Sequence, residues 1–218
     1  MVIRYPNGQI YRGPESPKSK NKLTGSKTDP IQKLQKRRNH SNRGMKLEEL
    51  INSSIEYYRQ QEIAVIHKKP TPVQIVNVDY PKRSAAKITE AYFRRASTTD
   101  YNGVYKGHYL DFEAKETKYK TSFPLQNFHD HQINHMQACE RQGGIVFVII
   151  YFSTLNRCFL LEGKDLFNTW VTYQRGGRKS IPFQTVEDKG HEIEFSYQPT
   201  VPFIDIVDKL LSVSYTHL

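Results

Sequence analysis

The sequence predicts an α/β protein in which one central mixed β-sheet is flanked by helices. Two observations indicate this class. Apolar residues recur at helical spacing in several segments, and short β-prone runs occupy the stretches between them. The apolar run Ile145–Phe152 has the length of a buried strand and is the clearest of these runs. A length of 218 residues suits one domain with extensions.

Each expected element follows from a local pattern. In chain order they are a helix (44–61), two strands (62–68 and 74–79), a basic arm or stalk (82–95), a hairpin (98–105 with 108–115), a helix (129–142), two strands (145–152 and 157–161), a helix (164–173), an edge strand (191–197) and a last helix (204–211). Pro70 and Pro72 separate the first two strands, because proline interrupts a ladder. Lys106-Gly107 is a two-residue turn suited to a hairpin. Gly143-Gly144 and Gly176-Gly177 end two of the helices.

The positive charge is concentrated at the amino-terminal end. The net charge is +10, and residues 1–44 hold eleven Lys and Arg against two acidic residues. With few apolar residues to form a core, residues 1–40 are expected to be a disordered basic arm. Residues 41–212 then form the domain, and 213–218 a tail. A basic arm is typical of a nucleic-acid binder, and a solubilising tail is the alternative.

Other classes are excluded by composition. The longest apolar run is far shorter than the ~18 residues that a membrane span needs, and the first residues lack the apolar segment of a secretory signal. The two cysteines, Cys139 and Cys158, do not make a disulfide framework and are expected to be small buried residues. A reducing, cytoplasmic setting is the expected location.

The predicted hairpin brings together the residues with the clearest chemistry. Alternate side chains of a strand share one face, so Asp111, Glu113 and Lys115 lie on one side, and the apolar residues between them pack on the other. Asp100 comes from the partner strand. Two carboxylates and a lysine at one end of a sheet suit phosphodiester hydrolysis, because carboxylate oxygens bind Mg²⁺ and a lysine offsets phosphate charge. A surface hairpin with paired charges is the alternative.

Several other residues have two interpretations. His131 and His135 have the i, i+4 spacing of a zinc site, but a third ligand is missing, so phosphate-facing or helix-end histidines are expected. Asp111 is expected to pair with a lysine or to cap the hairpin. Glu48 is a candidate outer-shell carboxylate or a solvated residue of the first helix. Phe123 and Phe128 are expected in the core.

Six sequence blocks give a specific resemblance. Asp100, Glu113 and Lys115 form the pattern of the PD-(D/E)xK nucleases. The blocks are SNRGM (41–45), HKKPTPV (67–73), YPKRSAA (80–86), STTDYNG (97–103), DFEAKET (111–117) and FPLQNFHDH (123–131). In these blocks the chain resembles the RecU family of Holliday-junction resolvases, strongly over residues 41–150 and loosely beyond.

The resemblance implies a restriction-endonuclease-like fold, a projecting stalk at about residues 70–95, and a homodimeric endonuclease that uses Mg²⁺, with Mn²⁺ as a substitute. It implies the metal ligands Thr98, through its carbonyl, Asp100, Glu113 and Gln132. Lys115 would stabilise the transition state. The DNA contacts expected on this basis and from the clustered basic residues are Arg43, Lys68, Lys69, Lys82 and Arg83.

The expected activity is the resolution of four-way junctions by paired symmetric nicks, in recombination and repair. The resemblance also implies modulation of the strand-exchange recombinase. Two alternatives remain at this point: a general PD-(D/E)xK nuclease that cuts linear or damaged DNA, and a junction-binding architectural protein without catalysis.

Overall fold

The protein is described by a computed structural model that covers residues 46–80, 86–93 and 98–215, with side chains to residue 212. The helices are α2 (Leu47–Gln60), α3 (Asp130–Arg141), α4 (Gly163–Gln174), α5 (Phe183–Lys189) and α6 (Phe203–Tyr215), with a 3-10 turn η2 (Leu125–Asn127). The strands are β1 (Val65–Lys68), β2 (Val73–Asp79), β3 (Lys87–Phe93), β4 (Tyr101–Tyr105), β5 (His108–Thr117), β6 (Ser122–Pro124), β7 (Ile145–Phe152), β8 (Arg157–Glu162), β9 (Ser180–Pro182) and β10 (His191–Ile193).

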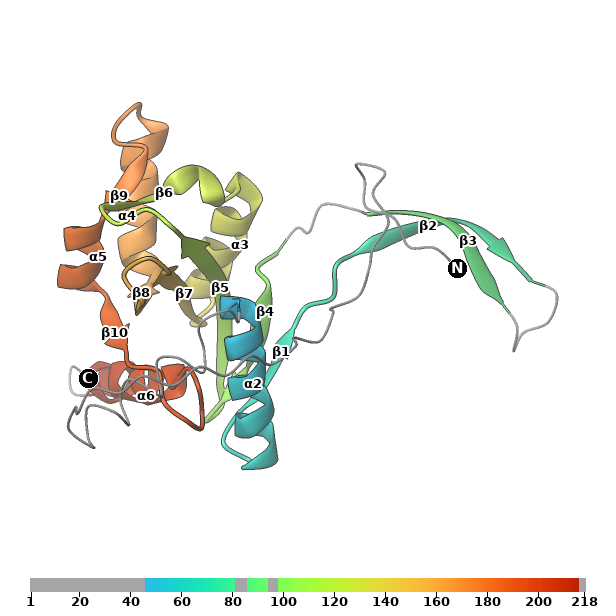
Figure 1. Cartoon of the computed structure of the whole chain (residues 1–218), viewed down its shortest axis with the longest axis horizontal. Coiled ribbons are helices and arrows are strands. Elements are labelled where there is room, and N and C mark those ends of the chain that lie inside the picture. The colour runs from blue at the N-terminus through green and yellow to red at the C-terminus, as the bar shows by residue number, and fades with distance from the viewer. Residues whose placement is uncertain (1–45, 81–85, 94–97, 216–218) are drawn as a thin grey trace, which may run out of the picture. The chain divides into compact units, whose positions relative to one another are not determined.

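The central sheet is mixed, as the sequence predicts. Six strands lie in the order β1-β4-β5-β7-β8-β10. All neighbours are antiparallel except β5 and β7, which are parallel. Helix α3 lies in the connection between these two strands (Figure 1), because a parallel pair needs a crossover rather than a tight turn.

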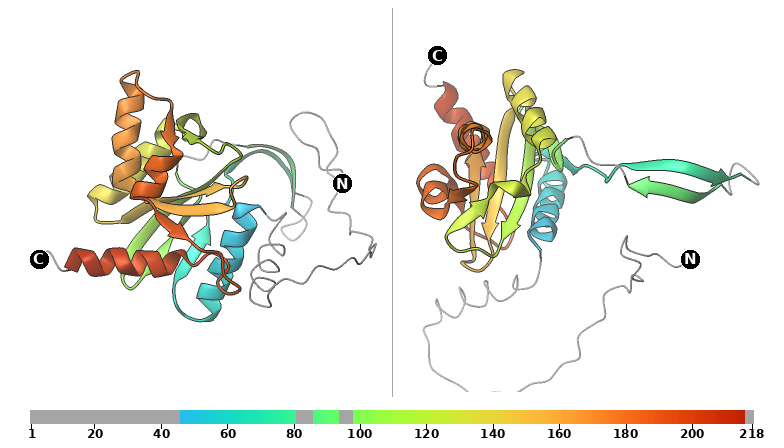
Figure 2. Two further views of the ribbon diagram at one scale, coloured as in Figure 1. Left: turned by 60° about the vertical axis from the view of Figure 1, so that its left-hand side comes forward. Right: turned by 90° about the horizontal axis from the view of Figure 1, so that it is seen from above.

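Helices cover both faces of this sheet (Figure 2). One core joins α2 and α6 to one face and includes Leu50, Ile51, Phe112 and Phe203. The other joins α3, α4 and α5 to the opposite face. Phe123 and Phe128 belong to the second core, as expected for apolar aromatics. None of the helices in the described residues is long and apolar enough to cross a membrane.

The β4–β5 hairpin is confirmed at its predicted turn. Lys106 and Gly107 have φ of 47° and 80°, and two consecutive positive φ values match the right-handed twist of the strands that they join. Tyr105 pairs with His108 across the turn, and Tyr101 pairs with Phe112 farther along. The turn therefore fixes the register that sets which residues of β4 meet the carboxylates of β5.

Strands β2 and β3 form an antiparallel sheet of their own. Every residue of β3 is exposed, and β2 is exposed except at Val78, which is half-buried. Strand β3 lies inside the basic segment 82–95, to which the sequence analysis assigned no strand. Its exposed apolar side chains include Ile88, Tyr92 and Phe93.

Four short elements and several ends differ from the sequence predictions, including the starts of β1 and β4, which lie three residues later than expected. Strands β6 and β9 pair with each other, and η2 and α5 follow them directly; none of these was predicted. The edge strand expected at 191–197 ends at Ile193. Helix α6 continues to Tyr215, past the predicted end at 211 and into the residues expected to be a tail. The arm 1–40 lies outside the described residues.

Candidate active site

The two faces of β5 differ as predicted. Leu110, Phe112 and Ala114 pack into the core under α2 and α6. Glu113 and Asp111 lie on the opposite face, where each contacts a side chain of α3. Both carboxylates are fully buried. Burial of a charge is costly unless it is paired and hydrogen-bonded, so the partners of these two residues define what each one does.

Stacked aromatic rings support this strand from behind. The ring of Phe112 stacks on Tyr101 of β4 at 4.8 Å and on Phe147 of β7 at 4.7 Å, with interplanar angles of 5° and 10°. Phe203 of α6 packs against Phe112 at 5.2 Å. Aromatic contacts of this kind add to the stabilisation from buried area. The segment of β5 that bears Glu113 is therefore held on a packed, three-strand platform.

Glu113 is the centre of what we call the Glu113 cluster, which also contains Asp100, Lys115 and Gln132. Its Oε2 accepts the backbone N–H of Asp100 at 3.0 Å. Its Oε1 lies 2.6 Å from Lys115 Nζ and accepts Gln132 Nε2 at 2.8 Å. The residues come from β5, from the residue before β4 and from the first turn of α3. The structure thus assembles four of the five predicted active-site residues around one buried carboxylate.

The electrostatics of this cluster suit a cation. Burial raises the pKa of the Glu113 carboxyl to about 7, the Lys115 ammonium lowers it, and the Asp100 carboxylate raises it again. Glu113 therefore lies close to a second carboxylate, while the Lys115 ammonium pairs with Glu113 itself. A divalent ion would relieve the repulsion between the two carboxylates, and oxygen ligands of this kind are those that Mg²⁺ takes. The residues present fit a hard divalent cation.

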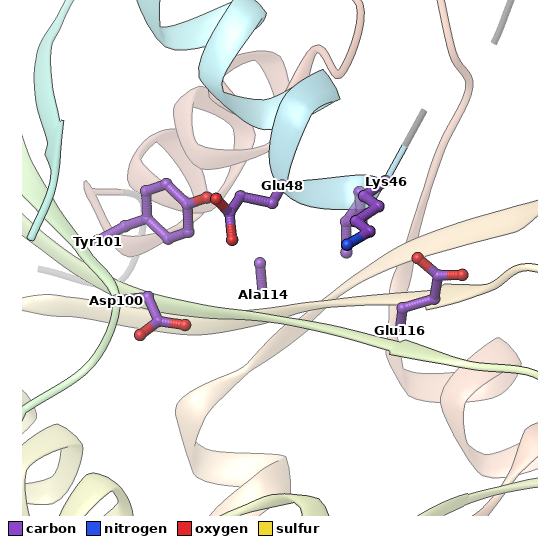
Figure 3. A pocket seen from close by; sticks show the side chains of 7 residues that line it. Lys46, Glu48, Asp100, Tyr101, Ala114 and Glu116 are labelled. Carbon is purple, nitrogen blue, oxygen red and sulfur yellow. The ribbon is translucent and has the colours of Figure 1, made fainter. Parts of the chain in front are cut away.

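Asp100 and Thr98 lie on the segment that leads into β4. Both are half-buried. Asp100 also lines a cavity of about 270 Å³ together with Glu48, Tyr101 and Ala114. Figure 3 shows Glu48 directed from α2 toward the sheet and the Asp100 carboxylate directed away from α2. The small Ala114 side chain leaves room between the strand and the helix, so Glu48 is near Asp100 but is not part of the Glu113 cluster.

Gln132 has two roles in this structure. Its Oε1 accepts the backbone N–H of His129 at 3.1 Å, which completes a capping box at the start of α3. Its Nε2 donates to Glu113. The amide therefore couples the helix end to the buried carboxylate. In this orientation the amide presents its NH₂ group, not Oε1, to Glu113.

The predicted basic residues have different surroundings. Lys68 is exposed, and its Nζ lies 2.5 Å from Glu48 Oε1. Lys69 is half-buried, and its Nζ donates to Thr99 Oγ1 at 2.9 Å and to Asp111 Oδ2 at 3.1 Å. The ammonium of Lys69 thus faces a buried carboxylate rather than the surface. Arg43, Lys82 and Arg83 lie outside the described residues.

Asp111 gathers a second group, which we call the Asp111 cluster: Asp111, Lys69, Thr99, Tyr109 and His135. The sequence predicts that Asp111 pairs with a lysine or caps the hairpin, and Lys69 is that lysine. It does not place Thr99, Tyr109 or His135 beside Asp111. His135 was expected to face phosphate or to lie at a helix end, but it contacts Asp111 from within α3. The alternation of β5 places Tyr109 on the same face as Asp111 and Glu113, whereas Lys69, Thr99 and His135 meet Asp111 only through tertiary contacts.

Asp111 and His135 also lie beside Cys139, which is half-buried. The three possible ligand atoms are all within 4.8 Å of one another. His135 and Cys139 are one helical turn apart on α3, and Cys139 Sγ is 3.5 Å from His135 Nε2. However, Asp111 Oδ2 already accepts the Lys69 ammonium, so a cation at this place would have to displace a charge that balances the carboxylate.

The comparison with protein families decides the classification. The model of the family described as RecU, Recombination protein U, matches residues 42–209. The chain belongs to the RecU family. A RecU relative named Holliday junction resolvase RecU, from Lactiplantibacillus plantarum, is 56% identical over 97% of both chains. Relatives of the same name from a Geobacillus species and from Bacillus licheniformis are 56% and 53% identical, over 96% of this chain and 98% of theirs.

Proposed function

We propose that this chain is a divalent-cation-dependent endonuclease that resolves four-way DNA junctions. The observation that carries the proposal is the Glu113 cluster, in which a buried carboxylate with a raised pKa lies between Asp100 and Lys115. The names of relatives that match over nearly the full length support the substrate class. The mixed sheet with helices on both faces is compatible with a restriction-endonuclease-like fold.

In this proposal Asp100, Glu113, the Thr98 carbonyl and Gln132 hold Mg²⁺, for which Mn²⁺ can substitute. A bound ion of this type lowers the pKa of a water ligand and offsets charge on the phosphate. Lys115 then has the remaining task. Its Nζ pairs with Glu113 and lies 5.9 Å from the Phe128 ring centroid, and in this proposal it stabilises negative charge that develops on the phosphate. Glu48 acts from outside the ligand set.

DNA contacts are proposed for two regions. The basic residues Arg43, Lys82 and Arg83, together with the arm 1–40, would neutralise phosphates without reading sequence. Lys68 lies at the surface beside Glu48 and is a further contact. The β2–β3 sheet, with its exposed apolar and aromatic side chains, is the proposed stalk that recognises the branch. Affinity for the junction should fall steeply as salt increases.

The symmetry of the substrate suggests the assembly. A four-way junction is roughly two-fold symmetric, so a homodimer would present two active sites to opposed strands and make paired nicks. The family resemblance further suggests contact with the strand-exchange recombinase. The homodimer and the recombinase contact extend the proposal beyond the cleavage of one strand.

The test is strand cleavage of a synthetic four-way junction with Mg²⁺, compared with a matched duplex, for the wild type and Asp100→Asn. The expected result is symmetric nicks in the junction by the wild type, and binding without nicks by the variant. Equal cutting of the duplex would indicate a general nuclease instead. Junction binding with no cutting by either protein would indicate an architectural protein and contradict the proposal.

A further inference from the structure

The Asp111 carboxylate is surrounded by donors on both of its oxygens. Oδ1 accepts Thr99 Oγ1 at 2.5 Å. Oδ2 accepts Tyr109 Oη at 2.9 Å and Lys69 Nζ at 3.1 Å, and lies 3.2 Å from His135 Nε2. The carboxylate is fully buried. An array of this kind is directional, because each donor has to keep its angle and distance to one group.

The partners of Asp111 come from separate parts of the chain. Tyr109 lies on β5 itself, and His135 lies on α3. Lys69 directly follows β1, and Thr99 directly precedes Asp100. Asp111 therefore joins the strand of the catalytic carboxylate, the helix that bears Gln132 and the segment that bears Asp100.

Two hydrogen bonds extend this connection to Asp100. The backbone N–H of Lys69 donates to the carbonyl of Asp100 at 2.7 Å. On its other side, the N–H of Asp100 donates to Glu113. Lys69 Nζ also donates to Thr99 Oγ1. The backbone at residues 99 and 100 is thus fixed between two carboxylates that are two residues apart on the same face of β5.

Simple packing does not account for this arrangement. A buried ion pair is often no more stabilising than apolar side chains of similar volume, and in some proteins it serves instead to fix one geometry. Here the contacts of Asp111 fix the backbone path of residues 98–100. A shift of about 1 Å in a reacting or binding group can cost about 10²-fold in rate.

From these contacts we infer that Asp111 is a positioning residue, which sets the place of Asp100 and of the Thr98 carbonyl by holding Thr99 and Lys69. The inference rests on the proposed function, in which residues 98 and 100 bind the cation. Asp111 itself does not touch the reacting atoms. Its removal should loosen the 98–100 segment and weaken cation binding, while the surface that meets DNA is unchanged.

The test uses Asp111→Asn and Thr99→Val in the full-length protein. Asparagine keeps the shape of the side chain but places an NH₂ among donors, and valine removes one hydroxyl. Hydrogen exchange of residues 98–101 in the cation-free protein should be about tenfold faster in both variants, as expected for the loss of one local hydrogen bond. Affinity for Mn²⁺, measured by electron paramagnetic resonance, should fall about tenfold or more. Junction binding in EDTA should be unchanged.

A matched control separates positioning from general stability. Ser54 on α2 is also fully buried, and its hydroxyl donates to Leu50 O at 2.9 Å and accepts Val201 N at 2.8 Å. Ser54→Ala should lower the melting temperature without altering Mn²⁺ affinity or exchange at residues 98–101. If Asp111→Asn and Thr99→Val behave like this control, with unchanged Mn²⁺ affinity, the inference is wrong.

The double variant Asp111→Asn/Thr99→Val gives an additional test. Because both substitutions interrupt the same contact, the loss of Mn²⁺ affinity in the double variant should be smaller than the sum of the two single losses. Additive losses would contradict a shared role. None of these measurements requires cleavage. A wild type that fails to cut junctions therefore overturns the proposed function, whereas unchanged Mn²⁺ affinity in the variants overturns the positioning inference.

Discussion

The Glu113 and Asp111 clusters occupy the same face of one strand, and their carboxylates are equally buried, but their surroundings differ in charge. Asp111 faces the Lys69 ammonium, two hydroxyl groups and an imidazole, and among the described residues no second carboxylate contacts it. Glu113 has an ammonium beside it and a second carboxylate, that of Asp100, close enough to raise its pKa. Like charges gathered at a buried position raise the pKa of one carboxyl or are offset by a cation. Because the Asp111 and Glu113 carboxylates are equally buried, the second carboxylate distinguishes the proposed cation site from its structural neighbour.

The largest effect is expected when the negative charge of Glu113 is removed. Glu113→Gln should lower the rate of junction cleavage by about 10²–10³-fold, because a cation loses a charged ligand and Lys115 loses its partner. Thermal unfolding of the cation-free variant at pH 8 should occur at a higher temperature than in the wild type, since the raised pKa of Glu113 means that its ionised form destabilises the fold. Glu116→Gln is the control: Glu116 is on the same strand but exposed, and cleavage should be nearly unchanged. A variant of Glu113 that still cuts would contradict its assignment.

The second effect concerns the counter-charge of Asp111. Lys69→Met should destabilise the protein by about 3 kcal/mol, because the buried Asp111 carboxylate loses its ammonium partner. Lys68→Met removes the neighbouring lysine, which forms an exposed pair with Glu48, and should cost less than about 1 kcal/mol. Chemical denaturation of both variants measures the difference. Equal losses would show that Lys69 does not stabilise the buried carboxylate.

Sequence patterns located the Glu113 cluster better than the Asp111 cluster. The alternation of residues 110–115 predicts the face of the strand on which Glu113 lies. The Lys106-Gly107 turn sets the register of the hairpin, which brings Glu113 beside Asp100. Those signals are local, so they serve for Asp100, Glu113 and Lys115, whereas Gln132, which meets Glu113 across 19 residues, was expected only from the family resemblance. The contacts of Asp111 with Lys69 and His135 span 42 and 24 residues. They depend on how β1 and α3 pack, which no local pattern specifies.

The same distinction explains the fold predictions. The strand Ile145–Phe152 was predicted with its exact bounds, because it is one continuous apolar run. Strands β6 and β9 have three residues each and exist only as partners of one another. Strand β3 is exposed throughout and lies in a segment rich in basic residues, so that segment was interpreted as an arm or stalk without a strand.

The third prediction uses the raised pKa of Glu113. The carboxyl has a pKa of about 7 in the folded, cation-free protein and an ordinary value of 4.5 when unfolded. The folded state therefore binds the proton more tightly. The contribution of Glu113 to stability is complete below pH 4.5 and is lost as the pH rises to 7, with a slope of at most about 1.4 kcal/mol per pH unit.

Cation binding has the opposite dependence on pH. It requires the ionised carboxylate, so the affinity for Mn²⁺ should rise by up to about tenfold per pH unit below pH 7 and level off above it. Calorimetric titration between pH 5.5 and 8 would measure this. In Glu113→Gln, the decrease in stability between pH 4.5 and 7 should be reduced. An unchanged slope in that variant would assign the titration to another group.

The smallest expected effect tests where the catalytic region ends. Glu48 shares a cavity with Asp100 but pairs with Lys68 at the surface, so it lies outside the ligand set. Glu48→Gln should reduce Mn²⁺ affinity by no more than about tenfold, the lower limit for groups that act through a ligand. Lys68→Met should increase the affinity for Mn²⁺, since it removes a positive charge near the cation. A loss in Glu48→Gln as large as that in Glu113→Gln would instead make Glu48 a direct ligand and extend the Glu113 cluster to helix α2.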